Sequence, residues 1–346
     1  MSGDATALTR ALEAALAPGP GGSPTGPDRA ALDEALRDAL SGGKRFRPLL
    51  VACVHDALGG TAGAAVPQVG AAVELLHTGF LVHDDVIDGD DLRRGRPSTP
   101  GRFRADAVKA GASPSGADTY ARAAAILVGD LALSHAMRAV ALCEVDRAGR
   151  ALLLELFDAA LRVSAAGELA DVRLSLGLED PTLAEVLTME ACKTAAYSFE
   201  LPMQAGAVLA GADPDTVTGV GRVGHLLGIA YQLLDDLDGV FGDPSGTGKE
   251  PFGDLREGKR TPLVVHARRT PTWGRISGYL GRGDLGAADA ARVRHALEES
   301  GSRTFVEDLA GEHLREAQAH AARLGLPTDL IHDVGAVSSG RATGAA

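Results

Sequence analysis

Residues 74–98, ELLHTGFLVHDDVIDGDDLRRGRPS, change abruptly from an apolar segment to a run of aspartates and then to arginines. The apolar residues before the aspartates have the spacing of a helix. Asp84 and Asp88 are four residues apart, so a helix would place them on one face. Two like charges one turn apart repel each other, and a bound divalent cation would reverse that effect. The stretch therefore predicts an apolar helix whose acidic end binds a cation.

Three arginines, Arg93, Arg94 and Arg96, follow this acidic segment. Their planar guanidinium groups suit phosphate oxygens. Mg²⁺ typically takes one or two protein carboxylates and completes its shell with substrate phosphates. A solvated helix end explains a single segment of this kind equally well, so the interpretation needs a second one.

A second acidic segment, YQLLDDLDGVFGDP at residues 231–244, also ends an apolar helical run. Asp235 and Asp238 are three residues apart and lie near one helix face, with Gln232 one turn before Asp235. Two such helix ends in one chain are hard to attribute to chance. We expect their carboxylates to oppose each other around a shared metal–phosphate centre.

Further cations lie in three other segments. SGGKRFRP, residues 41–48, places three cations after two adjacent glycines, but its spacing is not that of a P-loop. Lys193 precedes a threonine, and Lys249 and Lys259 lie in a Gly-rich loop. Each of these segments alone also fits solvated surface charge.

The composition excludes several classes of protein. The 346 residues carry a net charge of −12 and only 4% aromatic residues, which argues against a nucleic-acid binder. Cys53, Cys143 and Cys192 are odd in number and far apart, which favours reduced core residues in a cytoplasmic protein. The longest uncharged stretch, residues 57–73, contains a proline and is too short for a membrane span. The first residues lack a basic segment followed by an apolar one, so no secretory signal is expected there.

The chain is predicted to be all-α, as a single large domain over residues 29–337. An N-terminal arm and Pro/Gly linker would precede it at residues 1–28, and a disordered tail would follow at residues 338–346. Helical spacing covers residues 29–41, 46–58, 65–92, 119–143, 147–177 and 302–323. Asp180-Pro181 and Asp213-Pro214 are typical helix starts. Residues 105–118 and 242–260 are predicted to be connections, and convincing strands are absent.

In their order and spacing, GGKRFRP, ELLHT, DDVIDGDDLRRGRPS, ILVGD, KT, YQLLDD and GK…DLREGKRTPL resemble the trans-isoprenyl diphosphate synthases, or polyprenyl synthetases. The resemblance covers roughly residues 30–320. It implies a helical bundle around a deep central cavity, usually a homodimer. Such enzymes use Mg²⁺ to condense isopentenyl diphosphate with an allylic diphosphate, and they need no side-chain nucleophile.

The resemblance also implies residue roles. Three Mg²⁺ ions would be held around the allylic diphosphate by Asp84, Asp88 and Asp235. The neighbouring carboxylates, Asp85 and Asp236, would support them. The allylic diphosphate would be contacted by Arg93, Lys193, Lys249 and the nearby Lys259. The isopentenyl diphosphate site would consist of Gly43, Lys44, Arg47, His77 and Arg94. The developing carbocation would be stabilised, and proton loss guided, by Thr194 and Gln232.

Product length should depend on Gly79 and Phe80. Phe80 precedes Asp84 by four residues, which places it ~6 Å deeper along a helix, and Gly79 has no side chain to narrow the cavity. One aromatic beside a glycine suggests geranylgeranyl diphosphate (C20), with farnesyl diphosphate (C15) as the alternative.

One departure from the family pattern is Gly239, which stands where the second motif usually has its last aspartate. It leaves open a partner subunit without activity of its own. A class I terpene cyclase is a further alternative, although it would not need the second diphosphate pocket implied by GGKRFR and Arg94.

Overall fold

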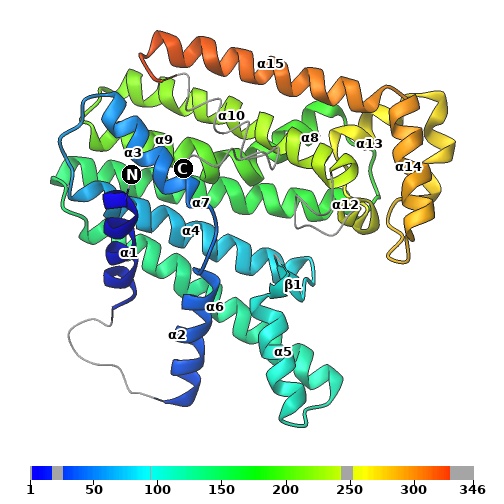
Figure 1. Cartoon of the computed structure of the whole chain (residues 1–346), viewed down its shortest axis with the longest axis horizontal. Coiled ribbons are helices and arrows are strands. Elements are labelled where there is room, and N and C mark those ends of the chain that lie inside the picture. The colour runs from blue at the N-terminus through cyan, green and yellow to red at the C-terminus, as the bar shows by residue number, and fades with distance from the viewer. Residues whose placement is uncertain (1, 18–25, 94, 243–251, 328–346) are drawn as a thin grey trace. The chain divides into compact units, whose positions relative to one another are not determined.

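The structure is a computed structural model that describes residues 2–17, 26–93, 95–242 and 252–327. Its elements are helices, apart from one short hairpin, which confirms the all-α prediction (Figure 1). The chain divides into two compact units. Unit 1 comprises residues 1–155 and 205–211, and unit 2 comprises residues 156–204 and 212–346. The linker at 18–25 and the tail at 338–346 lie outside the described residues, and the single domain over 29–337 stays a prediction.

Unit 1 is built around helix α4 (Ala65–Ile87), which contacts four other helices of the unit. These neighbours are α1 (Ser2–Leu16), α3 (Phe46–Ala57), α5 (Thr99–Lys109) and α6 (Pro114–Leu142). Helix α2 (Pro27–Ala39) packs on α6. Val69, Val73 and Leu76 of α4 are completely buried. The apolar segment before the first aspartates is therefore the core helix of unit 1.

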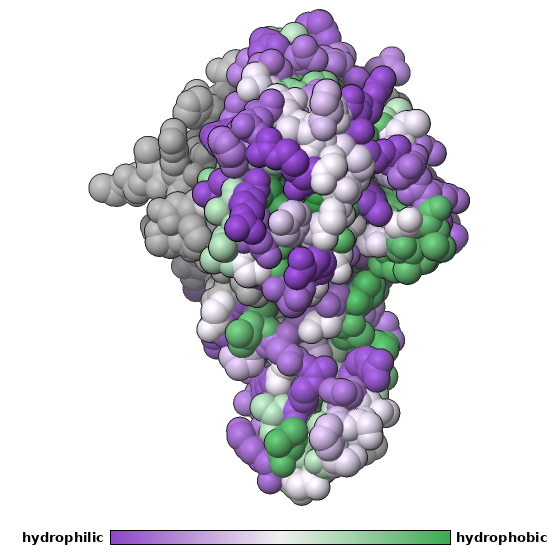
Figure 2. All heavy atoms as spheres, turned by 90° about the vertical axis from the view of Figure 1, so that its right-hand side faces the viewer, coloured by the Kyte–Doolittle hydropathy of each residue, from purple (hydrophilic) through white to green (hydrophobic). Residues whose placement is uncertain are grey.

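Helix α6 is apolar but only partly covered. By length and composition alone both α4 and α6 could cross a membrane, but the most apolar window of α4 is 72% buried and that of α6 only 33%. Figure 2 shows hydrophobic residues, in green, exposed among polar ones on one face of the molecule. On α6 the exposed hydrophobic residues are Tyr120, Ile126, Leu127 and Leu142.

Unit 2 holds the second half of α7 (Arg147–Ser175) and a long helix, α10 (Pro214–Phe241). Before α10 come α8 (Leu183–Glu190), the π-helix η1 (Ala191–Glu200) and the start of α9 (Leu201–Leu209). After it come α12 (Gly253–Glu257), α13 (Pro262–Ala267), the 3-10 helices η2 (Pro271–Arg275) and η3 (Ser277–Tyr279), α14 (Ala287–Glu299) and α15 (Ser302–Arg323).

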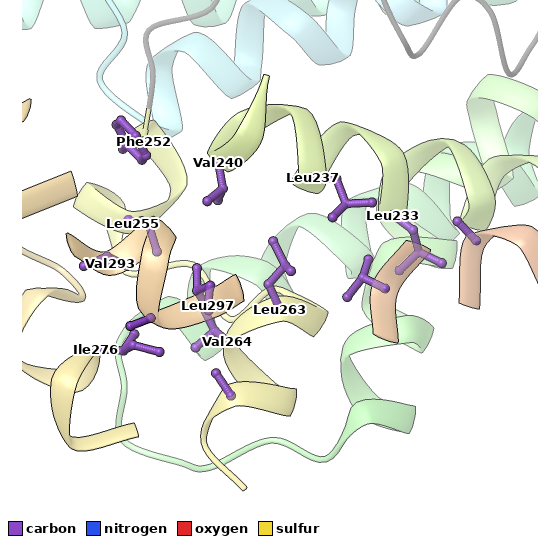
Figure 3. Close-up of a cluster of buried hydrophobic side chains, with 14 of the residues drawn as sticks. Leu233, Leu237, Val240, Phe252, Leu255, Leu263, Val264, Ile276, Val293 and Leu297 are labelled. Carbon is purple, nitrogen blue, oxygen red and sulfur yellow. The ribbon is translucent and has the colours of Figure 1, made fainter. Parts of the chain in front are cut away.

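The core of unit 2 fixes the end of α10. Leu233, Leu237 and Val240 of α10 pack in one buried cluster with Leu263 of α13 and Leu297 of α14 (Figure 3). Burying these side chains, at roughly 1.5–3 kcal/mol each, holds the second acidic segment on a rigid helix.

Several predicted boundaries were wrong. The connection at 105–118 is mostly helix, because Ser113 caps α6 through the backbone N–H of Gly116 and shortens the gap after α5. Helix α4 ends at Ile87 rather than near residue 92, since Gly89 adopts the left-handed φ of +74°.

Other elements were missed or shifted. The start expected at Asp180 lies at Leu183, where Thr182 and Glu185 form a capping box. Helix α12 lies within the loop expected at 242–260. Of the cysteines expected in the core, Cys53 is exposed, because it lies off the face of α3 that buries Leu50, Val51 and Val54.

Candidate active site

The first acidic helix end is closed by a short hairpin. Strand β1 (Leu92–Arg93) pairs antiparallel with β2 (Arg96–Pro97), and Arg93 turns back over the last turns of α4. Its Nη2 donates to Asp84 Oδ2 at 3.0 Å, and its Nε donates to Asp85. The segment thus places one guanidinium directly on two of the predicted carboxylates.

The two adjacent aspartates lie in different environments. Asp85 is 3% exposed, and burial raises its pKa to about 6, against the lowering effect of Arg93. Asp84 and Asp88 remain half-buried on the last turn of the helix. Arg93 contacts both Asp84 and Asp85, so burial is what separates them: Asp84 and Asp88 are more accessible to an ion from solution than Asp85 is.

The cationic loop of unit 1 is attached to the same helix. Gly42 and Gly43 have φ of +81° and +79°, which only glycine adopts without strain. Arg45 Nη1 forms an ion pair with Glu74 Oε1 at 2.9 Å, one turn before His77 on α4. This ion pair joins the GGKR loop to α4 near His77. Arg96 Nη1 donates to Ser41 Oγ at 3.4 Å, which joins the hairpin to the start of the same loop. Arg94 lies outside the described residues.

In unit 2, Thr194 and Gln232 come together, and Asp236 joins them. Thr194 Oγ1 donates to Gln232 Oε1 at 2.9 Å, and Gln232 Nε2 donates to Asp236 Oδ1 at 2.9 Å. Gly228 makes this approach possible, because a Cβ there would lie 2.3 Å from Ala195 Cβ. The π-helical geometry of η1, a form that is frequent at functional sites, carries Thr194.

Glu190 is a site residue that the sequence did not reveal. Its carboxyl group faces Asp236 in the interior of unit 2, and burial raises the pKa of both groups well above the ordinary range. Asp254 raises the pKa of Asp236 further. Protonated Glu190 can then donate to Asp236, so the pair need not hold two negative charges in the interior of unit 2. A glutamate three residues before Lys193 was the signal in the sequence.

Lys193 lies between two carboxylates that were also missed. Its Nζ is 2.6 Å from Asp171 Oδ2 and 3.0 Å from Glu168 Oε2, both on α7. Gly167 lets α7 approach closely, because a Cβ there would lie 2.3 Å from the backbone N of Lys193. Acidic residues spaced by three, as in GELAD at 167–171, were the available signal.

Most of the chain is similar to proteins of known family. The family model for polyprenyl synthetase matches residues 29–298. A geranylfarnesyl diphosphate synthase of Aeropyrum pernix is 34% identical over 86% of this chain and 88% of its own length. A geranylgeranyl diphosphate synthase of Mycobacterium tuberculosis is 34% identical over 85% of this chain and 79% of its own.

This chain belongs to the polyprenyl synthetase family. The fold agrees: the crystal structure of a geranylgeranyl pyrophosphate synthase from Corynebacterium glutamicum, in complex with isoprenyl diphosphate and magnesium, superposes with a TM-score of 0.85. It is 28% identical, and the match covers 98% of each chain. The protein is accordingly a prenyltransferase, one of the short-chain trans-prenyl diphosphate synthases.

In this polyprenyl synthetase, Asp254 occupies the space beside Gly239. A Cβ at position 239 would lie 3.0 Å from Asp254 Oδ2. Lys259 Nζ lies 2.8 Å from Glu257 Oε2 and 3.8 Å from Asp254 Oδ1. A carboxylate and a lysine are thus present next to the position of the missing aspartate. Lys249 lies outside the described residues.

The donor set of the synthetase suits Mg²⁺ only with a further ligand. Among the described residues, no three His, Cys, Asp or Glu side chains are grouped closely enough to hold a metal ion by themselves. Hard carboxylate oxygens at Asp84, Asp88 and Asp235, completed by substrate phosphates, are the arrangement that Mg²⁺ prefers. Because Asp235 belongs to the other unit, its position opposite Asp84 stays a prediction.

Gly79 does not leave an open cavity beside α4, as its missing side chain had suggested. The space beside it is filled by α6, since a Cβ there would lie 2.7 Å from Leu133 Cδ2 and 3.2 Å from Gly129 O. Gly79 is thus a point of close helix packing, and a bulky residue there would push against α6. Phe80, half-buried on the next position of α4, remains the candidate for limiting product length in this synthetase.

Proposed function

We propose that this prenyltransferase condenses isopentenyl diphosphate with an allylic diphosphate and makes geranylgeranyl diphosphate. The observation that supports it best is the presence of two separate sets of cations in unit 1. The first consists of Lys44 and Arg47, which flank Arg45, and Arg45 is paired with Glu74 one turn before His77. The second is Arg93, which donates to Asp84 and Asp85. A condensation brings two diphosphates together, whereas a terpene cyclase binds one.

The proposed chemistry follows from charge. Mg²⁺ bound by Asp84, Asp88 and Asp235 would neutralise the diphosphate as it leaves. The resemblance to the family gives Arg93, Lys193, Lys249 and Lys259 the role of contacting this diphosphate. The allylic C–O bond breaks, its electron pair goes to the diphosphate oxygen, and an allylic cation remains. The C3–C4 double bond of isopentenyl diphosphate then attacks this cation, and C2 loses a proton to the departing diphosphate.

The polar network of unit 2 has a defined part in this step. Thr194 uses its proton to donate to Gln232, so the lone pairs of Thr194 Oγ1 are directed elsewhere. Gln232 is oriented in turn because its amide donates to Asp236. Oxygen lone pairs stabilise a nearby carbocation without reacting as strongly as water would. Asp236 is therefore proposed to act through Gln232.

The length of the product is the finer part of the proposal. The named relatives make products of different lengths: geranylfarnesyl, geranylgeranyl and farnesyl diphosphate. A single aromatic, Phe80, one turn below Asp84 supports an intermediate length. Farnesyl diphosphate is the competing outcome.

We further propose that the enzyme works as a homodimer in the cytoplasm. The four exposed hydrophobic residues of α6 would be covered by a second copy. Cys53, Cys143 and Cys192, all in the described part of the chain, form no disulfide, as expected in a reducing compartment.

Labelled isopentenyl diphosphate tests the reaction directly. The purified chain would be incubated with Mg²⁺, labelled isopentenyl diphosphate and geranyl or farnesyl diphosphate, and the products separated by chromatography. We expect label in a linear C20 diphosphate. Release of diphosphate with an unlabelled cyclic hydrocarbon would identify a cyclase, and no release at all would indicate a subunit without activity of its own.

A further inference from the structure

Arg45, between the two cations assigned to isopentenyl diphosphate, adopts an unusual backbone conformation. Its φ of +51° is in the left-handed region, which residues with a Cβ rarely occupy. It directly precedes α3 and follows two left-handed glycines. Such a conformation persists only where the surroundings hold it in place.

Two contacts of its side chain hold Arg45. One guanidinium nitrogen, Nη1, is 2.9 Å from Glu74 Oε1, and the other, Nη2, donates to the backbone oxygen of Leu40 at the end of α2. The same guanidinium thus joins α4 to the end of α2, across the loop that carries Lys44.

A contribution to stability does not explain why a glutamate occupies position 74. It is 7% exposed in the middle of the apolar helix α4, and within the described part of the chain its Oε2 is buried without a hydrogen-bond partner. A buried ion pair is weak support for a fold, because its desolvation can cancel its attraction. A well-packed apolar residue at position 74 would serve the core of unit 1 equally well.

The position of the pair suggests another role. Lys44 is adjacent to Arg45, Arg47 follows two residues later, and His77 lies one turn after Glu74 on the same face of α4. We infer that Glu74, through Arg45, positions Lys44 and Arg47 relative to His77 to receive the diphosphate of isopentenyl diphosphate. Glu74 and Arg45 are positioning residues, and this inference rests on the proposed function.

The test compares Glu74→Gln, Arg45→Gln, Arg45→Lys and the double variant Glu74→Gln/Arg45→Gln with the wild-type full chain. The KM for each substrate, kcat and the binding of isopentenyl diphosphate by calorimetry are measured together with the melting temperature. Asp33→Asn is the matched control, because Asp33 pairs with Arg29 on the exposed surface of α2.

We expect the single variants to raise the KM and Kd for isopentenyl diphosphate about tenfold, corresponding to 1.4 kcal/mol. The KM of the allylic substrate and kcat should change less than about twofold, which is within 0.4 kcal/mol. The double variant should lose less than the sum of Glu74→Gln and Arg45→Gln, because no unpaired charge stays buried. Asp33→Asn should behave as wild type.

Equal effects on both substrates, or a lower melting temperature with unchanged KM values, would overturn the inference and leave the proposed function standing. If Glu74→Gln does not fold, Arg45→Lys decides by the same criteria, because it keeps the charge and loses only the fork. A wild-type chain that binds no isopentenyl diphosphate would overturn both.

Discussion

Adjacent aspartates in this protein differ in their exposure to solvent and in their contacts. Asp84 and Asp85 are neighbours in the sequence, yet one is half-exposed and the other is buried against Arg93. Likewise, Asp235 is half-exposed near the end of α10, whereas Asp236 points into the interior of unit 2 with Glu190 and Gln232. In each DD pair, then, one carboxylate is partly exposed to solvent and the other is buried.

Replacement of the partly exposed aspartate of each DD pair should abolish catalysis without unfolding the protein. Asp84→Ala and Asp235→Ala are expected to lower kcat at least about 100-fold, since each removes charge that holds the metal–diphosphate complex. The free energy of unfolding should change by no more than about 1 kcal/mol, because the Asp84–Arg93 pair is partly exposed. Steady-state assays and thermal melts measure both quantities.

Asp106→Ala, on the exposed side of α5, is the control for this pair of variants and should keep full activity. Near-normal turnover of Asp235→Ala would show that the second acidic segment is not a metal site.

Replacement of single cations should change the KM of one substrate and not of the other. Lys44→Ala and Arg47→Ala are expected to raise the KM for isopentenyl diphosphate, and Lys193→Ala the KM for the allylic substrate. The size should be about tenfold or more, as for the loss of one charge-assisted contact of 1.5–3 kcal/mol. Lys193→Ala should also lower the melting temperature, because buried Asp171 loses its partner. If both groups of variants raised the same KM, the division into two diphosphate sites would be wrong.

At the scale of elements, glycines set how closely the helices of the site approach. The line Gly224, Gly228 and Gln232 lies on one face of α10, and the first two contact the backbone of η1 or its small side chains. The hydrogen bond between Thr194 and Gln232 depends on that approach.

Gly228→Ala should therefore impair both stability and activity. Its Cβ would lie 2.5 Å from Ala195 Cα, which is backbone and cannot move aside alone. We expect a loss of about 1–3 kcal/mol in unfolding free energy, as for an overpacked core, and a lower kcat. Gly311→Ala, whose Cβ would meet only the end of Arg315, should instead stabilise α15 by up to about 1 kcal/mol. Denaturant unfolding compares the two.

The same helix α4 that ends in the aspartates should set the length of the product. Phe80→Ala is expected to lengthen it by at least one isoprene unit, because the ring lies about 6 Å below Asp84 along the helix. Product chromatography measures the shift. Gly79→Phe, in contrast, would press on Leu133 and Gly129, so a change of product there would also report a displaced α6. An unchanged distribution in Phe80→Ala would assign the limit to another residue.

At the scale of the whole molecule, helix α6 is exceptional. Its apolar window is only one-third buried, although helices of comparable hydropathy, such as α4, form the core. Exposed apolar faces of this kind are usually covered by another protein, which fits the proposed homodimer.

A charge on this face should dissociate the dimer. Leu127 is 51% exposed in the middle of α6, and Leu127→Glu is expected to shift the sedimentation coefficient from that of a dimer to that of a 35.4 kDa monomer. Val108→Glu, on the exposed side of α5, should leave the dimer intact. A wild-type chain that sediments as a monomer at micromolar concentration would contradict the proposal.

The sequence by itself was sufficient for the class of fold and for the family. Hydrophobic spacing and local motifs carry this information, because a helix places residues three and four apart on one face whatever its neighbours are. The spacing even marked α10 at Asp213-Pro214 and α15 over residues 302–323.

Only the tertiary structure decided which partners those residues have. Glu74, Glu168, Asp171 and Glu190 lie 22 or more positions from the motif residues they contact, and the chain between them does not link them. The same holds for the space beside Gly79, which looks open in the sequence and is filled by a helix 50 residues later. Burial and pairing depend on which surfaces meet, and those contacts are set by packing of the whole unit rather than by the residues next to each side chain.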